Sequence, residues 1–193
     1  MLCGDEKLAS IIQELPEPYI QSSGNVFHDL MSCVLEQQIH YRSTKKVFEK
    51  MLQSAGITLL SPDNSETFEE KAFDKAKLSQ SKYETVLEVL DLLDKNKPDW
   101  QNLNDAEVRA RLSTIKGIGS WTIDMILLYT LQRPDIFPAD DFHLKQIMTT
   151  LYELDPKQKL KAHMKAIAEG WGAHKSLAVL YLLAWKESQK NKP

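Results

Sequence analysis

Cysteine is scarce in this 193-residue chain, and its two cysteines, Cys3 and Cys33, lie far apart. Two thiols at that spacing cannot supply a zinc site or a four-thiolate iron–sulfur cluster. So low a cysteine content does not require an oxidising compartment, and we expect free thiols. The sequence therefore excludes a disulfide scaffold and a cysteine-ligated metal centre.

Long apolar runs are also missing. No stretch reaches the roughly 18 apolar residues that a membrane-spanning helix needs. The N-terminal segment MLCGDEKLAS lacks the basic start and apolar core of a secretory signal. The sequence therefore predicts a soluble, intracellular protein with no membrane partner. Its 42% hydrophobic content is enough for one substantial core or for two small lobes that share a cleft.

A strong positive charge is absent, because the formal net charge is -3. This argues against a protein that coats nucleic acid by bulk electrostatics. The charge is unevenly placed, however: acidic side chains outnumber basic ones over residues 61–110, and basic ones outnumber acidic ones over 143–193. The C-terminal quarter could present a basic face to phosphates, or its lysines could simply keep a helix solvated.

The pattern that is present is helical. Apolar residues recur three and four positions apart over 26–53, and no segment alternates with period two for long enough to suggest a sheet. Asn104-x-x-Glu107 is a capping-box signal that opens a short helix, and Pro134 should close a helix that starts at Trp121. We therefore expect an all-α fold with two helical lobes and an interlobe cleft.

Residues 116–128, KGIGSWTIDMILL, predict a tight turn between two helices. Gly117 and Gly119 allow positive backbone dihedral angles and leave room for another backbone, and Ile118 between them should plug the turn into the core. The amides of these residues and of Ser120 lie at the start of the next helix, where the positive end of its dipole suits a phosphate. An ordinary helix cap explains a bare Gly-x-Gly equally well.

A second stretch, DIFPADDFHLKQ, follows that helix and carries two adjacent carboxylates. Pro138 favours an extended approach to Asp140 and Asp141 at the start of a further helix. One carboxylate can cap this helix while the other points into a cleft, since Asp is a preferred N-cap residue. The pair alone predicts a cap. The hairpin, the 20-residue offset from Trp121 to Asp141 and the Pro-x-Asp-Asp pattern together form a more specific signal.

With these motifs the sequence resembles the helix-hairpin-helix (HhH-GPD) DNA glycosylases, and within them the alkylpurine branch of the 3-methyladenine DNA glycosylase II type. The resemblance extends over roughly residues 26–187. It rests on five segments, which are CVLEQQIHYRSTKKVFEKML, LSQSKYETVLEVLDLL, IKGIGSWTIDMILL, FPADDFHLKQ and WGAHKSLAVLYLLAWKE. It implies one glycosylase unit over 1–193, with one lobe from the N-terminal segment and the C-terminal helices and the other from roughly 30–135.

The resemblance also implies roles for individual residues. Asp141 matches the catalytic carboxylate, and Asp140 matches its structural neighbour, a helix cap or support. Gln38, with Gln37 beside it, falls where the family inserts a wedge side chain into the gap left by a flipped nucleotide; the alkyl-specific relatives have an apolar Leu there. The residues that match the DNA-binding hairpin are Lys116, Gly117, Ile118, Gly119 and Ser120, and Lys175 stands where relatives often contact a phosphate.

The base pocket implied by the resemblance is lined by Trp121 and Phe142. Met125 and His174 fall where the relatives carry aromatic residues, so the pocket here is less stacked. Strand-cleaving branches place a nucleophilic Lys at the position of Trp121, and without that amine a Schiff base with the sugar cannot form by the family route. The resemblance therefore implies a monofunctional enzyme.

No cofactor or catalytic metal is implied, although some such hairpins hold a monovalent cation on backbone carbonyls, here those of Ser113, Ile115 and Ile118. The expected partner is double-stranded DNA with alkylated bases, and the expected state is a monomer. The protein would be cytoplasmic, at the nucleoid, in a bacterium, and nuclear in a eukaryote. Three alternatives stay open: a non-catalytic hairpin module, a helical protein-interaction domain, and a glycosylase for hypoxanthine or ethenoadenine.

Overall fold

The computed structural model describes residues 4–20, 22–36, 41–73, 79–96 and 98–190. Every regular element among these residues is a helix, which confirms the all-α prediction. Contacts divide the chain into two compact units: unit 1 comprises Met1–Gln21 and Leu127–Pro193, and unit 2 comprises Ser22–Ile126. Within the described ranges, none of the helices combines the length and the apolar character needed to span a bilayer.

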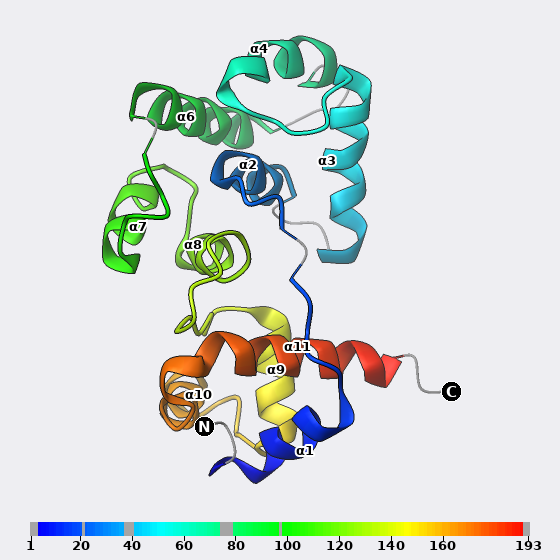
Figure 1. Ribbon diagram of the computed structural model, residues 1–193, viewed down its shortest axis with the longest axis vertical. Helices are drawn as coiled ribbons and strands as arrows, with labels where there is room; N and C mark the ends of the chain where they lie inside the picture. Colours follow the sequence, from blue (N-terminus) through cyan, green and yellow to red (C-terminus); the bar gives the residue numbers. More distant parts are fainter. Residues whose placement is uncertain (1–3, 21, 37–40, 74–78, 97, 191–193) are drawn as a thin grey trace. The chain divides into compact units, whose positions relative to one another are not determined.

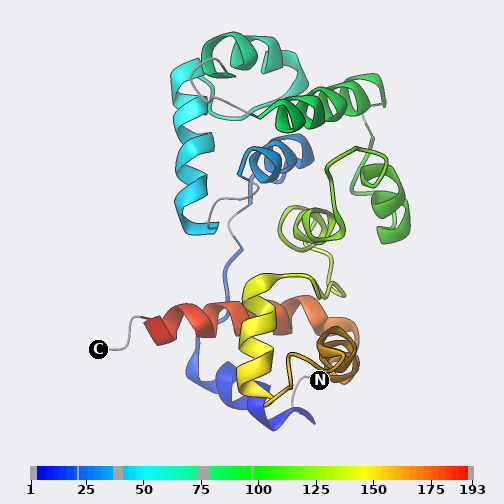
Figure 2. The same ribbon diagram turned by 180° about the vertical axis from the view of Figure 1, so that it is seen from behind.

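Unit 1 joins the two ends of the chain. Helix α11 packs against α9 and against the N-terminal α1, and α10 packs against α9 (Figures 1 and 2). Their apolar faces meet in a core that includes Leu8, Leu144, Met148 and Leu182, all fully buried. The helices are α1 (Glu6–Glu14), α9 (Phe142–Leu151), α10 (Leu160–Glu169), the 3-10 turn η5 (Gly172–His174) and α11 (Lys175–Lys190).

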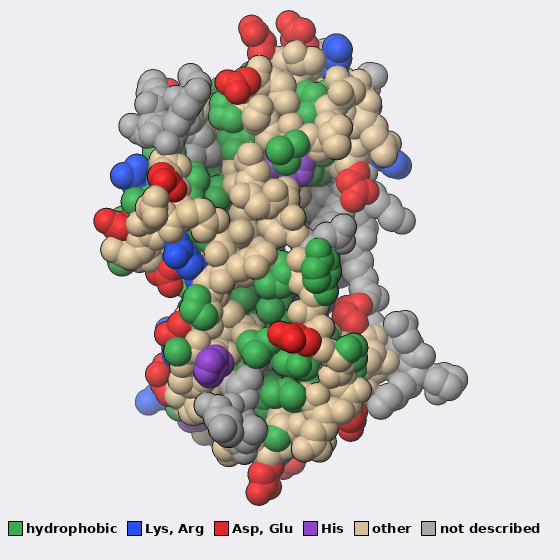
Figure 3. Space-filling view, viewed as in Figure 1, with side chains coloured by type: hydrophobic (Ala, Val, Ile, Leu, Met, Phe, Trp, Pro, Cys, Tyr) green, Lys and Arg blue, Asp and Glu red, His purple; other side chains and the backbone are tan. Residues whose placement is uncertain are grey.

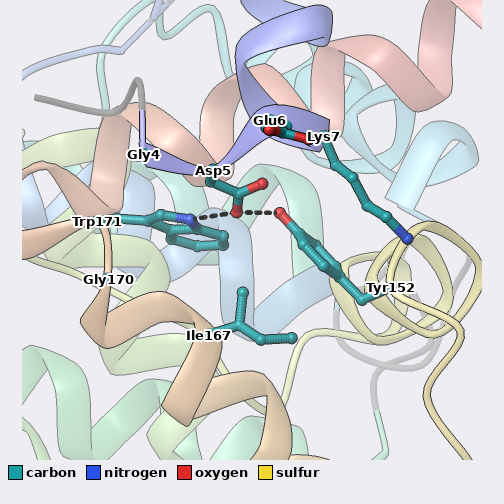
Figure 4. A pocket seen from close by; sticks show the side chains of 8 residues that line it. All are labelled: Gly4, Asp5, Glu6, Lys7, Tyr152, Ile167, Gly170 and Trp171. Atoms are coloured by element: carbon teal, nitrogen blue, oxygen red, sulfur yellow. Dashed lines mark hydrogen bonds between the residues drawn. The ribbon is translucent and has the colours of Figure 1, made fainter.

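The N-terminal segment is fastened to unit 1 by Asp5. One carboxylate oxygen accepts the Leu8 amide at 3.0 Å and caps α1, and the other accepts the Tyr152 hydroxyl at 2.6 Å and the Trp171 indole N–H at 3.0 Å (Figure 4). Burial alone would raise the pKa of Asp5, but these hydrogen bonds outweigh it and the net pKa is lowered. Asp5, Tyr152 and Trp171 line a cavity of about 440 Å³. Because Tyr152 ends α9, this contact fixes the far end of the helix that Asp141 begins.

Unit 2 is built around α2. This helix packs against α3 and α6, and its buried residues Phe27, Leu30 and Val34 recur three and four positions apart as the sequence predicts. The helices are α2 (Val26–Glu36), α3 (Tyr41–Ala55), η2 (Pro62–Asn64), α4 (Ser65–Phe68), η3 (Glu69–Phe73), α6 (Gln80–Asn96), α7 (Asp105–Leu112) and α8 (Ser120–Met125). The π-helical turn η4 (Ile126–Thr130) follows α8 and belongs to unit 1 except for Ile126.

A histidine links α2 to the loop after α3. His28 Nδ1 accepts the Leu60 amide at 3.0 Å, and its ring packs edge-on against Phe48 with the ring centroids 5.0 Å apart. Burial lowers the pKa of His28, and the nearby Asp29 opposes this only in part. The neutral ring is therefore the form that suits the folded state.

We expect unit 2 to lose stability in mild acid. Since the folded pKa of His28 lies below the unfolded value of about 6.5, protonation favours the unfolded chain, and the stability contributed by the neutral ring falls as the pH drops from that value through the folded pKa. Urea unfolding between pH 5 and pH 8 measures the effect. His28→Asn keeps an acceptor for Leu60 but cannot titrate, so its pH dependence should be flatter; equal slopes would contradict the assignment.

Candidate functional site

Asp141 stands at the start of α9, at the end of the segment that the sequence singles out. The Asp141 amide donates to the Pro138 carbonyl at 2.9 Å, which folds the PADD segment into a turn. Its Oδ1 accepts the Leu144 amide at 2.7 Å, and only 8% of the residue is exposed. N-capping fixes the orientation of the carboxylate, and the helix dipole attracts its negative charge.

Asp140 lies next to the helix cap and does not serve as the cap. The helix cap is Asp141, so of the two roles expected for Asp140, cap or support, the cap is wrong and the support stays a prediction. Its carboxylate instead lies 2.6 Å from the Lys161 ammonium on α10 and 3.5 Å from that of Lys145 on α9. The reason is geometric: the residue directly before the first helical residue is the one whose side chain reaches the exposed amides. Asp140 thus ties α10 to the segment that carries Asp141.

Phe142 is the first residue of α9, and it is 63% exposed. Its ring lies edge-on to the His143 ring at 5.5 Å, and the Lys186 ammonium lies 6.0 Å from its centroid. Lys186 also contacts His143 Nδ1 at 2.8 Å and donates to the Gln146 side chain. An exposed aromatic ring with a cation beside it therefore adjoins the buried carboxylate in unit 1.

His174 and Lys175 lie at the start of α11. His174 is exposed in η5. The Lys175 ammonium lies 2.7 Å from Asp135 and 3.8 Å from Glu169, and the hydrogen bond to Asp135 is the main cause of its raised pKa. The residue expected to contact a phosphate thus has two carboxylate partners. Among the described side chains that Figure 3 colours on this face of unit 1, Lys and Arg form no continuous patch.

The hairpin in unit 2 consists of α7, a turn over 113–119 and α8. Its first helix opens with the expected capping box, since Asn104 accepts the Glu107 amide at 3.0 Å and the Glu107 carboxylate accepts the Asn104 amide at 2.8 Å. The two helices are joined by an ion pair between Arg109 and the buried Asp124 at 2.6 Å. The first helix of the hairpin is thus capped at its N-terminus, and an ion pair joins its two helices.

The two glycines of the turn differ from each other. Gly117 has a φ of +92°, in the range that favours glycine, whereas Gly119 has a φ of -93° and N-caps α8. Both glycines allow a positive φ, and only Gly117 adopts one. Ile118 is buried as expected, and its amide donates to the Ile115 carbonyl at 3.1 Å. Gly119 and Ser120 are exposed.

Lys116 lies in the middle of this turn and contacts α6 twice. Its amide donates to the Glu88 carboxylate at 2.6 Å, and its ammonium lies 3.6 Å from Glu84. The side chain is 77% exposed, so the ion pair is weak in water. The backbone of Lys116 is held, while its ammonium can still meet another anion.

The remaining predicted residues divide between unit 2 and the undescribed part of the chain. Trp121 is partly exposed in the first turn of α8, and Met125 is buried at its end. Gln37 and Gln38 lie outside the described residues. Of the carbonyls suggested for a cation, that of Ile115 accepts the Ile118 amide. Within the described ranges no three His, Cys, Asp or Glu side chains gather as metal ligands.

Comparison with known proteins identifies the family. The model of the HhH-GPD superfamily base excision DNA repair protein matches residues 31–173. DNA-3-methyladenine glycosylase 1 of Schizosaccharomyces pombe is 27% identical over 168 residues, which is 84% of this chain and 72% of that protein.

Solved structures share the fold. A DNA-3-methyladenine glycosidase from Bacillus halodurans has a TM-score of 0.76 at 25% identity, covering 94% of this chain and 84% of that one. A 3-methyladenine DNA glycosylase from S. pombe, solved with abasic DNA, has a TM-score of 0.82 at 24% identity, covering 97% and 94%. The hairpin and the Asp141 segment both lie inside the matched range, and the chain belongs to the HhH-GPD superfamily of base excision DNA repair proteins.

Proposed function

We propose that this chain is a DNA glycosylase that flips an alkylated purine out of duplex DNA and hydrolyses its N-glycosidic bond. The observation that carries the proposal is Asp141, a mostly buried carboxylate fixed by N-capping at the end of the PADD segment. Capping alone does not require burial, because an Asp on the surface caps a helix equally well. The 27% identical relative is named DNA-3-methyladenine glycosylase 1, which supports an alkylpurine as the substrate class.

The proposed mechanism begins with base flipping, because a stacked base hides the glycosidic bond. Extrusion costs a few kcal/mol, which contacts with the bent duplex must offset. The ionised Asp141 would then face the sugar, stabilise the oxocarbenium-like charge, and orient or deprotonate the attacking water. Alkylation of a ring nitrogen makes the base a cationic leaving group, so little acid catalysis is needed.

The base itself would be held by Trp121 and Phe142, with Met125 and His174 as further candidates. A ring can attract a cationic base by roughly 0.5 to 2 kcal/mol. Lys186 already lies 6.0 Å from the Phe142 centroid, so a cationic base near that ring would meet a like charge. Trp121 is therefore our first candidate for the cation–π contact.

The hairpin turn supplies the proposed DNA contact. Gly119 and Ser120 are exposed at the start of α8, where backbone amides and the helix dipole suit a phosphate. On the resemblance of the sequence we retain Gln38, with Gln37 beside it, as the wedge that fills the gap left by the flipped nucleotide. We expect the protein to work as a monomer.

We further propose that the enzyme has no strand-cleaving activity. The strand-cleaving branches, which this chain resembles, carry a Lys at the position that Trp121 occupies here. An indole cannot form the Schiff base that cleavage by that route requires. The product should be an intact abasic strand.

The test is single-turnover incubation with methylated duplex DNA and with duplexes that contain one hypoxanthine or one ethenoadenine. We expect free 3-methyladenine or 7-methylguanine on chromatography, no strand nicks without alkali, and no protein–DNA adduct after borohydride reduction. DNA binding without release of any base would favour a non-catalytic hairpin module. Release of only the neutral bases would move the substrate class away from alkylpurines. Absent or salt-independent DNA affinity would favour a protein-interaction domain.

A further inference from the structure

The hairpin turn is attached to α6 by its backbone. The amide of Lys116 donates to the Glu88 carboxylate at 2.6 Å, across 28 residues of sequence. A charged acceptor makes this bond stronger than one between neutral groups. Lys116 directly precedes Gly117, so the contact fixes the backbone of the turn just before its two glycines.

A second contact holds the next residue. A Cβ atom placed on Gly117 would lie 2.4 Å from the Thr85 hydroxyl oxygen, so the backbone of the turn passes directly against α6. Thr85 is buried, and its hydroxyl donates to the Ser81 carbonyl at 3.0 Å, so its side chain is itself fixed. Glu88 thus binds one residue of the turn, and Thr85 of the same helix limits the space beside the next.

We propose that Glu88 is a positioning residue for DNA binding, acting through the Lys116 amide to set the backbone of the hairpin turn. The inference rests on the proposed function, because it requires that this turn bind DNA. The amides of Gly119 and Ser120 follow within four residues, and their direction depends on the backbone that Glu88 anchors. The proposed role requires no contact between Glu88 and the DNA.

The charge of Glu88 and its hydrogen bond act on DNA affinity with opposite signs. A carboxylate near a phosphate-binding turn repels DNA, so its removal by any substitution should raise affinity slightly. Loss of the hydrogen bond frees the Lys116 amide and lets the turn sample other conformations, which lowers affinity. Glu88→Gln removes the charge but keeps an acceptor oxygen, whereas Glu88→Ala removes both.

The experiment measures the affinity of the full chain and of both variants for a duplex with an abasic site analogue. We expect Glu88→Ala to bind about threefold to tenfold more weakly than the unmodified protein, and Glu88→Gln to bind as tightly or slightly more tightly. Asp91→Asn, on the exposed side of α6, is the matched control for charge and should not weaken binding. Glu88→Ala should raise the DNA concentration needed for half-maximal base release more than it lowers the rate at saturation.

A second measurement needs no DNA. Hydrogen exchange at the Lys116 amide should be faster in Glu88→Ala than in Glu88→Gln, with thermal unfolding of both variants as the check on folding. Equal affinities of Glu88→Ala and Glu88→Gln, or tighter binding by both, would overturn the positioning role. If the unmodified protein bound no DNA, the proposed function would fail instead, and the exchange result would still report whether Glu88 anchors the turn.

Discussion

Asp141→Asn should lower the single-turnover rate of base release by about 10³-fold or more, while affinity for an abasic duplex stays close to that of the unmodified protein. The substitution removes the negative charge that would stabilise the sugar cation. It keeps the side-chain oxygen that accepts the Leu144 amide at 2.7 Å, and Asn is as good an N-cap as Asp. The start of α9 is therefore preserved, and the loss reports chemistry rather than folding.

Asp140→Asn is the matched control, because it makes the same chemical change one residue away. It weakens the contacts to Lys161 and Lys145, which are partly exposed, so we expect only a small change in rate. Thermal unfolding of both variants separates a loss of stability from a loss of turnover. Near-full turnover by Asp141→Asn, or an equal loss in Asp140→Asn, would remove Asp141 from the catalytic role.

The local features of the fold could be predicted from the sequence because their causes lie within a few residues. The helical period of α2 and the capping box of Asn104 and Glu107 depend on neighbours three or four positions apart. The turn between α7 and α8 and the presence of an Asp cap before α9 could be predicted for the same reason. These local signals also carried the family resemblance, which the match over residues 31–173 confirms.

Contacts across long sequence separations could not be predicted. Asp5 meets Tyr152 and Trp171 across 147 and 166 residues, and no local pattern in the sequence marks it as more than a surface cap. The pair of Arg109 and Asp124 also depends on how two helices cross. An Asp within the apolar run TIDMILL was a signal for this pair, since a buried carboxylate needs a partner.

The residue types in the sequence do not determine which Asp caps α9 or which glycine of the turn has a positive φ. Either Asp of the PADD pair could have capped α9, and only the exact start of the helix determined that it is Asp141. Likewise, Gly at 117 and 119 permits a positive φ at both positions, but only Gly117 adopts one. Glycine allows a positive φ, but the packing of the turn against α6 determines that Gly117 adopts one.

Gly117→Ala should destabilise unit 2 by about 1–3 kcal/mol and weaken binding to an abasic duplex. A Cβ at this position would lie 2.4 Å from the buried Thr85 hydroxyl. A φ of +92° is also unfavourable for alanine, even where space for the Cβ is available. The turn must shift away from α6, which disturbs the amides that follow. Urea unfolding and DNA titration measure the two losses, and Thr85→Ala in the same chain should restore only the part due to the clash.

Gly119→Ala distinguishes an effect on the stability of the turn from an effect on DNA binding. Its φ is -93°, and an added Cβ meets no atom within 4 Å, so the substitution should cost only the difference between Gly and Ala as N-caps, about 1 kcal/mol or less. If a phosphate approaches the exposed backbone there, the added methyl group obstructs it, and affinity should fall by more than this small loss of stability explains. Unchanged affinity in Gly119→Ala would show that DNA does not approach this residue. The losses in Gly117→Ala would then arise from the fold of unit 2, and the turn would be a structural cap rather than a grip on DNA.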